Sequence, residues 1–150
     1  MDKKISFIGL GAMGGPMATN IIKKGIELFV YDIDENKKNK VVKEGGLVTN
    51  DILDISKDSD IVVTMLPATE QVKTVLLGEN GIINNLKKNS LILDMSTISP
   101  KGTDEIAKKC KENELRFIDA PVGRLVSHAI EGKSLFMVGC DDEKDFERVK

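Results

Sequence analysis

The chain has 150 residues, 41% of them hydrophobic, and a formal net charge of −2. That length suits one domain burying about 70% of its unfolded surface, and the scattered charges argue against a nucleic-acid or membrane-surface partner. Cys110 and Cys140 lack both metal-site spacing and the density of a disulfide framework, and no apolar stretch can span a membrane, so we expect a reduced, soluble, cytoplasmic protein without a metal site.

Short apolar runs alternate with amphipathic stretches from the start of the chain, a pattern that predicts strands and helices in turn. In the first half we expect a strand at 4–9, a helix at 15–24, a strand at 27–32, a helix at 34–44, a short strand at 47–49, a short helix at 51–56 and a strand at 60–66. Gly25 is expected to end the first helix, and Val41 and Val42 to turn inward from the second. The unbroken apolar run at 60–66 is typical of a strand buried on both faces of a parallel sheet.

The alternation continues through the second half. We expect a helix at 69–78, a strand at 90–95, a helix at 100–112, a strand at 115–120, a helical turn at 125–131, a strand at 134–139 and a helix at 141–150. Ser99 is the predicted N-cap of the helix that Pro100 opens. The sequence thus predicts one α/β domain over 1–150, with a Rossmann-type, doubly wound, mostly parallel sheet. Because the last helix reaches Lys150 without a cap, we expect a longer natural chain.

A glycine-rich turn, FIGLGAMGGPM at 7–17, separates the first predicted strand from the first predicted helix. Gly9, Gly11 and Gly14 fit the spacing G-x-G-x-x-G, which is a weak signal alone and a stronger one between a strand and a helix. Gly9 permits the tight turn, Gly11 lets the backbone approach a pyrophosphate, and Gly14 lets helix and strand pack closely. The helix start would bind the phosphates with backbone groups of the turn, including those of Ala12 and Met13. A purely structural corner is the alternative.

Asp32 ends the second predicted strand, eighteen positions after Gly14. A carboxylate at this place accepts hydrogen bonds from the hydroxyls of the adenosine ribose and repels a 2′-phosphate. No Arg or Lys follows before Lys37, so NAD is favoured over NADP. The alternative, a cap for the next helix, is weaker because Asp34 is better placed for it.

Three further segments join the glycine turn: MLPATEQV at 65–72, DMSTISP at 94–100 and DAPVGR at 119–124. Together the four motifs resemble the β-hydroxyacid dehydrogenases, which include 3-hydroxyisobutyrate dehydrogenase and tartronate semialdehyde reductase. Within that family, GENG at 78–81, DMSTI and PVGR are most similar to 3-sulfolactaldehyde reductases, which are also associated with succinic semialdehyde reduction. The resemblance implies an NAD-dependent oxidoreductase whose second, all-helical domain is absent from this chain.

The resemblance also implies roles for residues at the carboxyl ends of predicted strands, where open α/β sheets bind ligands. Leu66 and Pro67 would lie along NAD, Thr97 would meet the nicotinamide ribose, and Ser96 would meet the carboxylate of the substrate. Because Ser99 is the better helix cap, the hydroxyls of Ser96 and Thr97 are expected to be spare. The alternatives are that Leu66 is only a core residue and that the two hydroxyls belong to a plain turn.

The segment DAPVGR departs from the common pattern of the family. Most relatives follow Pro-Val with a Ser-Gly-Gly run that cradles a carboxylate, whereas here Gly123 is followed by Arg124. A guanidinium offers a planar fork of donors suited to a carboxylate or a sulfonate. We therefore expect Gly123 and Arg124 to bind the anionic tail of the substrate, with a surface arginine as the alternative. His128 is expected to be an ordinary, partly exposed histidine.

The implied reaction is hydride transfer between nicotinamide and a small anionic aldehyde or hydroxyacid. Sulfolactaldehyde and succinic semialdehyde are the expected substrates, with hydroxyisobutyrate and tartronate semialdehyde as alternatives. Relatives exchange the proton through a Lys supported by an Asn on a helix beyond this domain. We therefore expect no catalytic residue up to Lys150, no activity of this segment alone and a homo-oligomer at full length. A non-catalytic, regulatory NAD-binding module remains an alternative.

Overall fold

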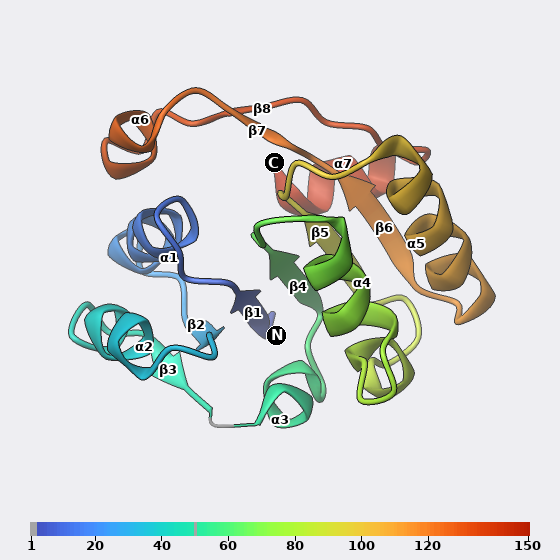
Figure 1. Ribbon diagram of the computed structural model, residues 1–150, viewed down its shortest axis with the longest axis horizontal. Coiled ribbons are helices and arrows are strands. Elements are labelled where there is room, and N and C mark those ends of the chain that lie inside the picture. The colour runs from blue at the N-terminus through green and yellow to red at the C-terminus, as the bar shows by residue number, and fades with distance from the viewer. Residues whose placement is uncertain (1–2, 50) are drawn as a thin grey trace.

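The computed structural model describes residues 3–49 and 51–150. Its main sheet has the strand order β3-β2-β1-β4-β5-β6, and every pair of neighbours is parallel (Figure 1). The strands of this sheet are β1 (Ile5–Ile8), β2 (Leu28–Tyr31), β3 (Leu47–Val48), β4 (Ile61–Thr64), β5 (Leu91–Asp94) and β6 (Arg116–Asp119). The direction of winding reverses between β1 and β4, and such a switch point is where open α/β sheets bind ligands.

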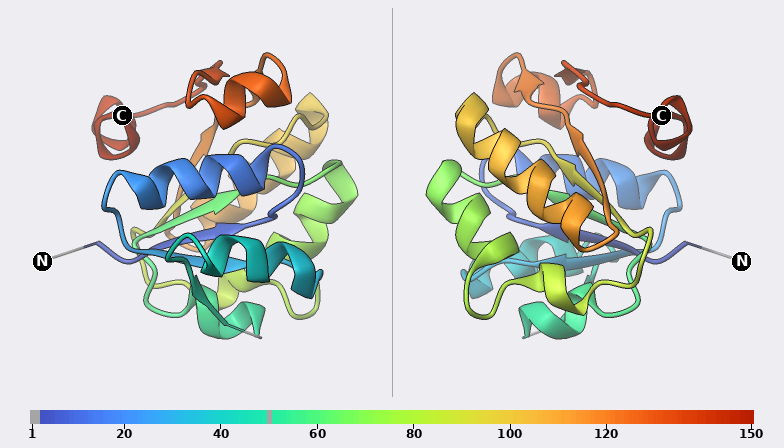
Figure 2. Two further views of the ribbon diagram at one scale, coloured as in Figure 1. Left: turned by 90° about the vertical axis from the view of Figure 1, so that its left-hand side faces the viewer. Right: turned by 90° about the vertical axis from the view of Figure 1, so that its right-hand side faces the viewer.

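Helices cover both faces of the main sheet (Figures 1 and 2). They are α1 (Gly14–Lys23), α2 (Glu35–Val42), α3 (Ile52–Ser56), α4 (Thr69–Leu77), the 3₁₀ helix η1 (Ile82–Asn85), α5 (Pro100–Glu112), α6 (Val126–Ile130) and α7 (Glu143–Val149). One core cluster includes Ala18 of α1 and Val41 of α2, and the other includes Val72 of α4 and Ile106 of α5. The predicted Rossmann-type fold is confirmed, and its main sheet is wholly parallel. No helix in the described ranges is long and apolar enough to cross a membrane.

The strand β4 shows why the unbroken apolar run at 60–66 predicted a buried strand. All four of its residues are buried; Ile61 and Val63 pack in one cluster and Val62 in the other. Helices on both faces leave no solvated side, so the strand has no exposed polar positions. Val42 differs from its prediction: it is 42% exposed, because α2 ends there and only Val41 reaches the core.

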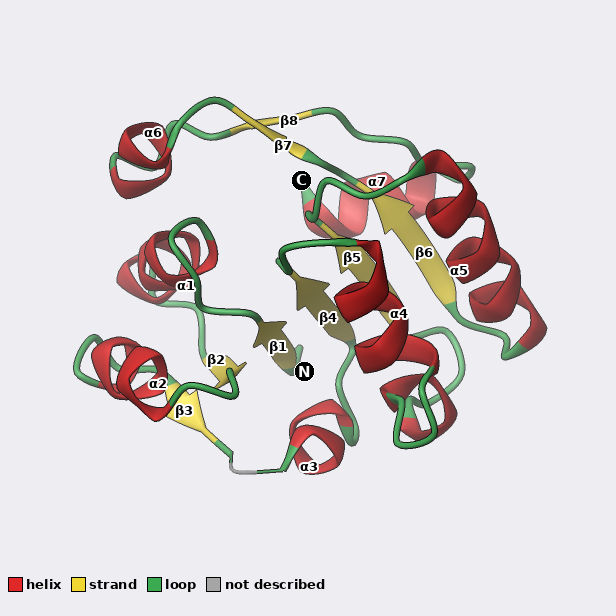
Figure 3. Cartoon of the chain, viewed as in Figure 1, coloured by secondary structure: helices red, strands yellow, loops and turns green. Residues whose placement is uncertain are grey.

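After β6 the chain leaves the main sheet as a segment that we call the strap, residues 120–140. Within it β7 (Val122–Gly123) pairs antiparallel with β8 (Leu135–Phe136), and the rest is largely loop (Figure 3). The strap reaches across to α1, where Asn20 Nδ2 donates to the carbonyl oxygen of Ala129 at 2.7 Å. The strand predicted at 134–139 is therefore much shorter and lies outside the main sheet. Its apolar side chains have little surface to pack on: Leu135 is 51% and Met137 58% exposed.

The two cysteines are free thiols, as expected. Cys110 is buried on α5, and burial raises the pKa of its thiol to about 12. Cys140 is half-buried, and its Sγ donates to the carbonyl oxygen of Asp142. The buried thiol is therefore a small core side chain rather than a reactive one.

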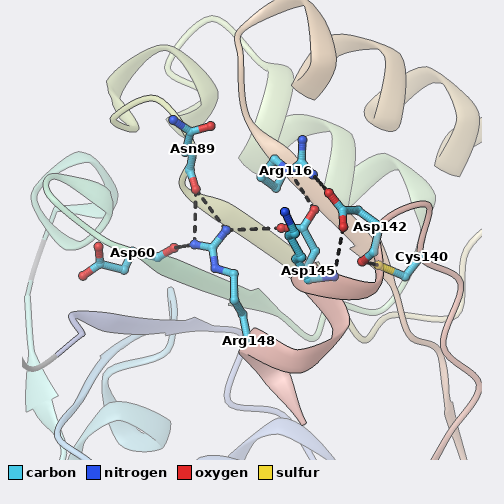
Figure 4. A network of polar contacts seen from close by, with 8 residues as sticks. Asp60, Asn89, Arg116, Cys140, Asp142, Asp145 and Arg148 are labelled. Carbon is cyan, nitrogen blue, oxygen red and sulfur yellow. Dashed lines mark hydrogen bonds and ion pairs between the residues drawn. The ribbon is translucent and has the colours of Figure 1, made fainter.

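An ion-pair network holds α7 against the amino-terminal ends of the strands (Figure 4). Arg116, the first residue of β6, pairs with Asp142 at the N-cap of α7 and with Asp145 Oδ2 at 2.6 Å. Arg148 of α7 donates from Nη1 and Nη2 to the carbonyl oxygen of Asn89, just before β5, at 3.2 Å each. Two arginines thus tie the last helix to the ends of two strands, opposite the edge where the glycine turn lies.

Replacing Arg116 with Ala should lower the free energy of unfolding by about 1 kcal/mol, because both ion pairs are lost from a half-exposed, solvent-screened network. Urea denaturation at low and high salt measures this, and the loss should shrink as salt rises. The matched control is Lys109→Ala, which removes only the exposed Lys109–Glu112 pair on α5 and should have a smaller effect. Equal losses in the two variants would contradict a stabilising role for the network.

Candidate functional site

The turn between β1 and α1 packs directly on the loop that follows β4. A Cβ atom on Gly9, whose φ is +98°, would lie 2.3 Å from the carbonyl oxygen of Met65, and a Cβ on Gly14 would lie 1.9 Å from the carbonyl oxygen of Gly9. The protein's own packing therefore requires both glycines. A Cβ on Gly11, in contrast, would meet no described protein atom within 4 Å. The protein's own packing therefore does not require a glycine at this position.

The start of α1 is open to an anionic group. Met13 stands at the N-cap and makes no capping hydrogen bond with its side chain, and the first turn holds no Asp or Glu. Pro16 lies in that first turn, where a missing N–H costs little. The positive end of the helix dipole thus faces the turn without a carboxylate of α1 to neutralise it, an arrangement that favours phosphate binding.

Asp32 follows β2 directly and is only 9% exposed. Its Oδ2 accepts from the amide of Leu10 at 2.7 Å, and its Oδ1 accepts from the amide of Asp34 at 2.9 Å. The carboxylate thus joins the glycine turn to the end of β2. The cap of α2 is Asp34, which accepts from the amide of Asn36. Because each carboxylate oxygen can accept more than one hydrogen bond, Asp32 keeps acceptor capacity for a ligand.

A cavity of about 570 Å³ opens over this turn. Eight of the nine cofactor-binding candidates line it: Gly9, Gly11, Ala12, Met13, Gly14, Asp32, Leu66 and Pro67. The structure adds lining residues that the sequence reasoning missed, namely Ile8, Tyr31, Ile33, Lys37, Met65, Glu70, Gln71, Thr74 and Val75. Ile33 is 91% exposed beside the carboxylate of Asp32 and offers an apolar surface at the cavity mouth.

Part of the missed wall had a signal in the sequence. Thr74 and Val75 lie on α4, which buries Val72 and Leu76 against the sheet. Helical periodicity therefore places Thr74 away from the core, whereas Val75, three positions after Val72, lies at the edge of the buried face and packs partly against it. The same periodicity does not say which neighbour that face meets, and here it meets the space over the glycine turn.

The ninth cofactor candidate, Thr97, is exposed and does not line this cavity. Ser96 beside it is fully buried, and its Oγ accepts from the amide of Leu66 at 2.9 Å. The expectation of a spare hydroxyl was wrong for Ser96, because the loop after β4 uses that oxygen as an acceptor. Ser99 caps α5 as predicted, accepting from the amide of Gly102 at 3.1 Å.

The remaining substrate candidates lie on the strap. Gly123 belongs to β7, and Arg124 after it has a φ of +73°, in the left-handed region that favours glycine. The side chain of Arg124 is exposed, and its Nη1 donates to the carbonyl oxygen of Lys133 at 3.0 Å. The amide of Val122 donates to the carbonyl oxygen of Met95 at 3.3 Å, so the strap begins beside the loop after β5. Neither Gly123 nor Arg124 lines the cavity over the glycine turn.

Two carboxyl groups meet at the carboxyl ends of β5 and β6. Asp94 and Asp119 are register partners, so their side chains leave the same face of the sheet. Burial raises the pKa of Asp94, against hydrogen bonds from Ser96 and Thr64 that lower it. Burial also raises the pKa of Asp119, and the neighbouring charge of Asp94 raises it further. Ionising the pair is therefore unfavourable in the folded protein.

Comparison with known proteins agrees with this geometry. The family described as the NAD binding domain of 6-phosphogluconate dehydrogenase matches residues 4–150. The probable mitochondrial 3-hydroxyisobutyrate dehydrogenase of Dictyostelium discoideum is 40% identical over 149 residues, which cover 99% of this chain and 46% of that protein. The 3-sulfolactaldehyde reductase of Escherichia coli K12 is 38% identical over 135 residues, covering 90% of this chain and 45% of that protein.

A solved structure shows the same fold. The 3-hydroxyisobutyrate dehydrogenase of Mycobacterium tuberculosis, determined with L-serine, superposes with a TM-score of 0.93 at 29% identity and covers 100% of this chain and 50% of that one. This chain spans about half the length of the curated relatives it matches. The likeness therefore covers about half of each of those proteins, over the residues of this chain that match the NAD-binding family.

Gly11→Ala tests directly whether the glycine turn binds the phosphates of the cofactor. We expect it to weaken NADH binding about tenfold or more, since the added methyl group takes the space that the phosphates need, and to leave the melting temperature unchanged. NADH fluorescence titration and thermal melting measure the two effects. The control is Gly139→Ala on the strap, whose Cβ would make only an ordinary contact 3.6 Å from the carbonyl oxygen of Asp119. Unchanged NADH affinity in Gly11→Ala would contradict phosphate binding at the glycine turn.

Asp94→Asn tests the raised pKa of the buried carboxyl group. Because the folded-state pKa of Asp94 lies above its ordinary value of 3.8, the folded state holds this proton more tightly than the unfolded state. The stability of the unchanged chain relative to Asp94→Asn should therefore be highest below that value and fall as the pH rises toward the raised pKa. Urea denaturation from about pH 3 to about pH 8 measures the difference. A difference that is flat with pH would show that Asp94 is not perturbed.

Proposed function

Since this chain belongs to the family of the NAD binding domain of 6-phosphogluconate dehydrogenase, at the amino-terminal end of β-hydroxyacid dehydrogenases, we propose that it is the NAD-binding half of an enzyme acting on a small anionic aldehyde or hydroxyacid. The observation that carries this proposal is the cavity over the glycine turn, beside Gly11, whose Cβ position meets no described protein atom within 4 Å. NAD supplies the hydride chemistry when bound. The residues of this chain bind and orient it.

The proposed binding mode assigns each part of the dinucleotide to residues that line the cavity. The backbone at Gly11, Ala12 and Met13, with the start of α1, would hold the phosphates. Asp32 would accept from the adenosine ribose with the acceptor capacity that its two amide donors leave. Leu66, from the loop after β4, would form the opposite wall. Both walls are held by hydrogen bonds within the protein, so the site is preorganised for the cofactor.

The substrate would lie toward the strap and the loop after β5. Hydroxyisobutyrate and sulfolactaldehyde, the compounds in the names of the two curated relatives, carry a carboxylate and a sulfonate respectively. Arg124 is exposed and uses Nη1 for one backbone carbonyl, which leaves most of its donors for such an anion. We place sulfolactaldehyde or succinic semialdehyde first, and hydroxyisobutyrate or tartronate semialdehyde second.

The proton donor of the reaction would lie beyond Lys150, on a helix with a Lys and an Asn. Support for a missing partner comes from the strap, where large apolar side chains are exposed at Leu125 (71%), Ile130 (61%) and Met137 (58%). Solvent exposure of several such neighbours is typical of a surface that another part of a protein covers. Reading the coding sequence past Lys150 decides the matter. A helical extension with that Lys and Asn supports the enzyme, and a stop codon favours a regulatory NAD-binding module.

The reaction itself is tested on the protein encoded by the whole gene. NADH oxidation is followed with sulfolactaldehyde, succinic semialdehyde, methylmalonate semialdehyde and tartronate semialdehyde, and each assay is repeated with NADPH. We expect turnover of an anionic aldehyde and a preference for NADH, because Asp32 repels a 2′-phosphate. Turnover with none of these aldehydes would remove the proposed substrate class, and a preference for NADPH would remove the role given to Asp32.

Arg124→Ala tests the proposed anion contact. We expect KM for the anionic aldehyde to rise about tenfold or more, because a charge-assisted hydrogen bond to the tail is lost, while NADH affinity stays the same. The control is Lys133→Ala, which removes a nearby cation but keeps the carbonyl oxygen that Arg124 contacts. Similar KM values for Arg124→Ala and the unchanged enzyme would take Arg124 out of the site.

A further inference from the structure

Asp94 is buried at the end of β5, and the cavity described above does not include it. Its Oδ1 accepts two hydrogen bonds, from the hydroxyl of Thr64 at 2.8 Å and from the amide of Ser96 at 3.1 Å. Both partners are 0% exposed. One carboxyl oxygen therefore joins the last residue of β4 to the loop that follows β5.

Ser96 extends this connection to the cavity wall. Its Oγ accepts from the amide of Leu66 at 2.9 Å, and Leu66 lines the cavity. A Cβ placed on Gly9 would lie 3.0 Å from Cδ2 of Leu66, so the glycine turn packs against this side chain. The path of hydrogen bonds from Thr64 through Asp94 and Ser96 thus ends at a wall that the glycine turn touches.

The second oxygen of Asp94 shows that the residue is costly to the fold. Among the described residues no group donates to Oδ2, although the atom is buried. Buried polar atoms are nearly always paired, and an unpaired one lowers the free energy of unfolding. Asp119, the register partner of Asp94, adds a second carboxyl group on the same face. A residue chosen for stability alone would not place a half-satisfied carboxyl group here.

We propose that Asp94 is a positioning residue for NAD binding: it orients Ser96, and through Ser96 it fixes the loop Met65–Pro67 as a wall of the cavity. The assignment rests on NAD binding at that cavity. It requires the acceptor oxygen of Asp94 rather than its negative charge, because both bonds at Oδ1 come from neutral donors. An amide oxygen at the same position can accept the same two bonds.

The test compares Asp94→Ala, Asp94→Asn and Ser96→Ala in this chain. NADH titration gives the dissociation constant, and hydrogen exchange of the Leu66 amide reports the wall itself. We expect Asp94→Ala and Ser96→Ala each to raise the dissociation constant about fivefold and to speed the exchange of the Leu66 amide. The double variant Asp94→Ala/Ser96→Ala should bind NADH about as tightly as whichever single variant binds it less tightly, because both substitutions act on one path of hydrogen bonds. Asp94→Asn, which keeps the acceptor, should restore most of the affinity.

Ser90→Ala is the matched control. Ser90 is a buried serine just before β5, at the opposite end of the same strand, and its Oγ donates to the carbonyl oxygen of Ser59 at 2.7 Å. Its loss should lower the melting temperature and leave the NADH dissociation constant unchanged. A purely structural role for Ser96 would make the two serine variants behave alike.

Three results would overturn the assignment. One is an Asp94→Ala chain that binds NADH within about twofold of the unchanged chain. Where Asp94→Ala does not fold, Thr64→Val replaces it. Thr64→Val removes the hydroxyl that orients the carboxyl group of Asp94 and keeps the shape of the side chain. The second result is unchanged hydrogen exchange of the Leu66 amide in Thr64→Val. Absence of NADH binding by the unchanged chain would overturn the dinucleotide site together with the assignment, and so differs from a failure of the assignment alone.

Discussion

The close contact between the glycine turn and the loop after β4 is the constraint on which the ligand-binding edge depends. The winding of the sheet reverses between β1 and β4, so the loops that leave these two strands part toward opposite faces. They still touch where Gly9 meets the carbonyl oxygen of Met65, a contact that no side chain at position 9 would permit. The cavity lies between this turn and α4. In the proposed binding mode the dinucleotide would lie across this space with its phosphates at Gly11, which lines the cavity.

The two ends of the strands are held by different sets of polar contacts. At the amino-terminal ends, Arg116 and Arg148 tie α7 to the sheet through half-exposed ion pairs and backbone carbonyls. At the carboxyl ends, buried hydrogen bonds join Thr64, Asp94 and Ser96. The first set tolerates change because solvent screens it, whereas a buried network is costly when one member is left unpaired. Buried hydrogen bonds also lie at the amino-terminal ends, where Ser90 Oγ donates to the carbonyl oxygen of Ser59, so the ion pairs of α7 are the part of these contacts that tolerates change best.

The sequence predicted the parts of this protein in which apolar residues follow the period of a strand or helix, or in which the backbone adopts a special geometry. The buried run of β4, the N-caps at Ser99 and Asp34, and the glycine turn all follow from local chemistry. The wall formed by α4 was missed, because periodicity identifies an outward face but not its neighbour. Ser96 was misjudged for a related reason: its hydroxyl is used by Leu66, thirty residues away in the chain, and no local pattern carries such a contact. The prediction that Val42 turns inward was wrong because α2 ends at this residue, and the helix end leaves the side chain exposed.

The strap separates the fold from the features that would choose a substrate. Arg124 adopts a left-handed backbone conformation, which glycine would reach at lower cost. Among the described residues, its side chain donates a hydrogen bond to Lys133 within the strap itself rather than to the main sheet. In the proposed enzyme, changes at this position would therefore alter the contact with the anion and leave the dinucleotide cavity, which Arg124 does not line, intact. On this proposal, such independence would account for relatives that are named for a hydroxyisobutyrate and for a sulfolactaldehyde and are each close to 40% identical to this chain.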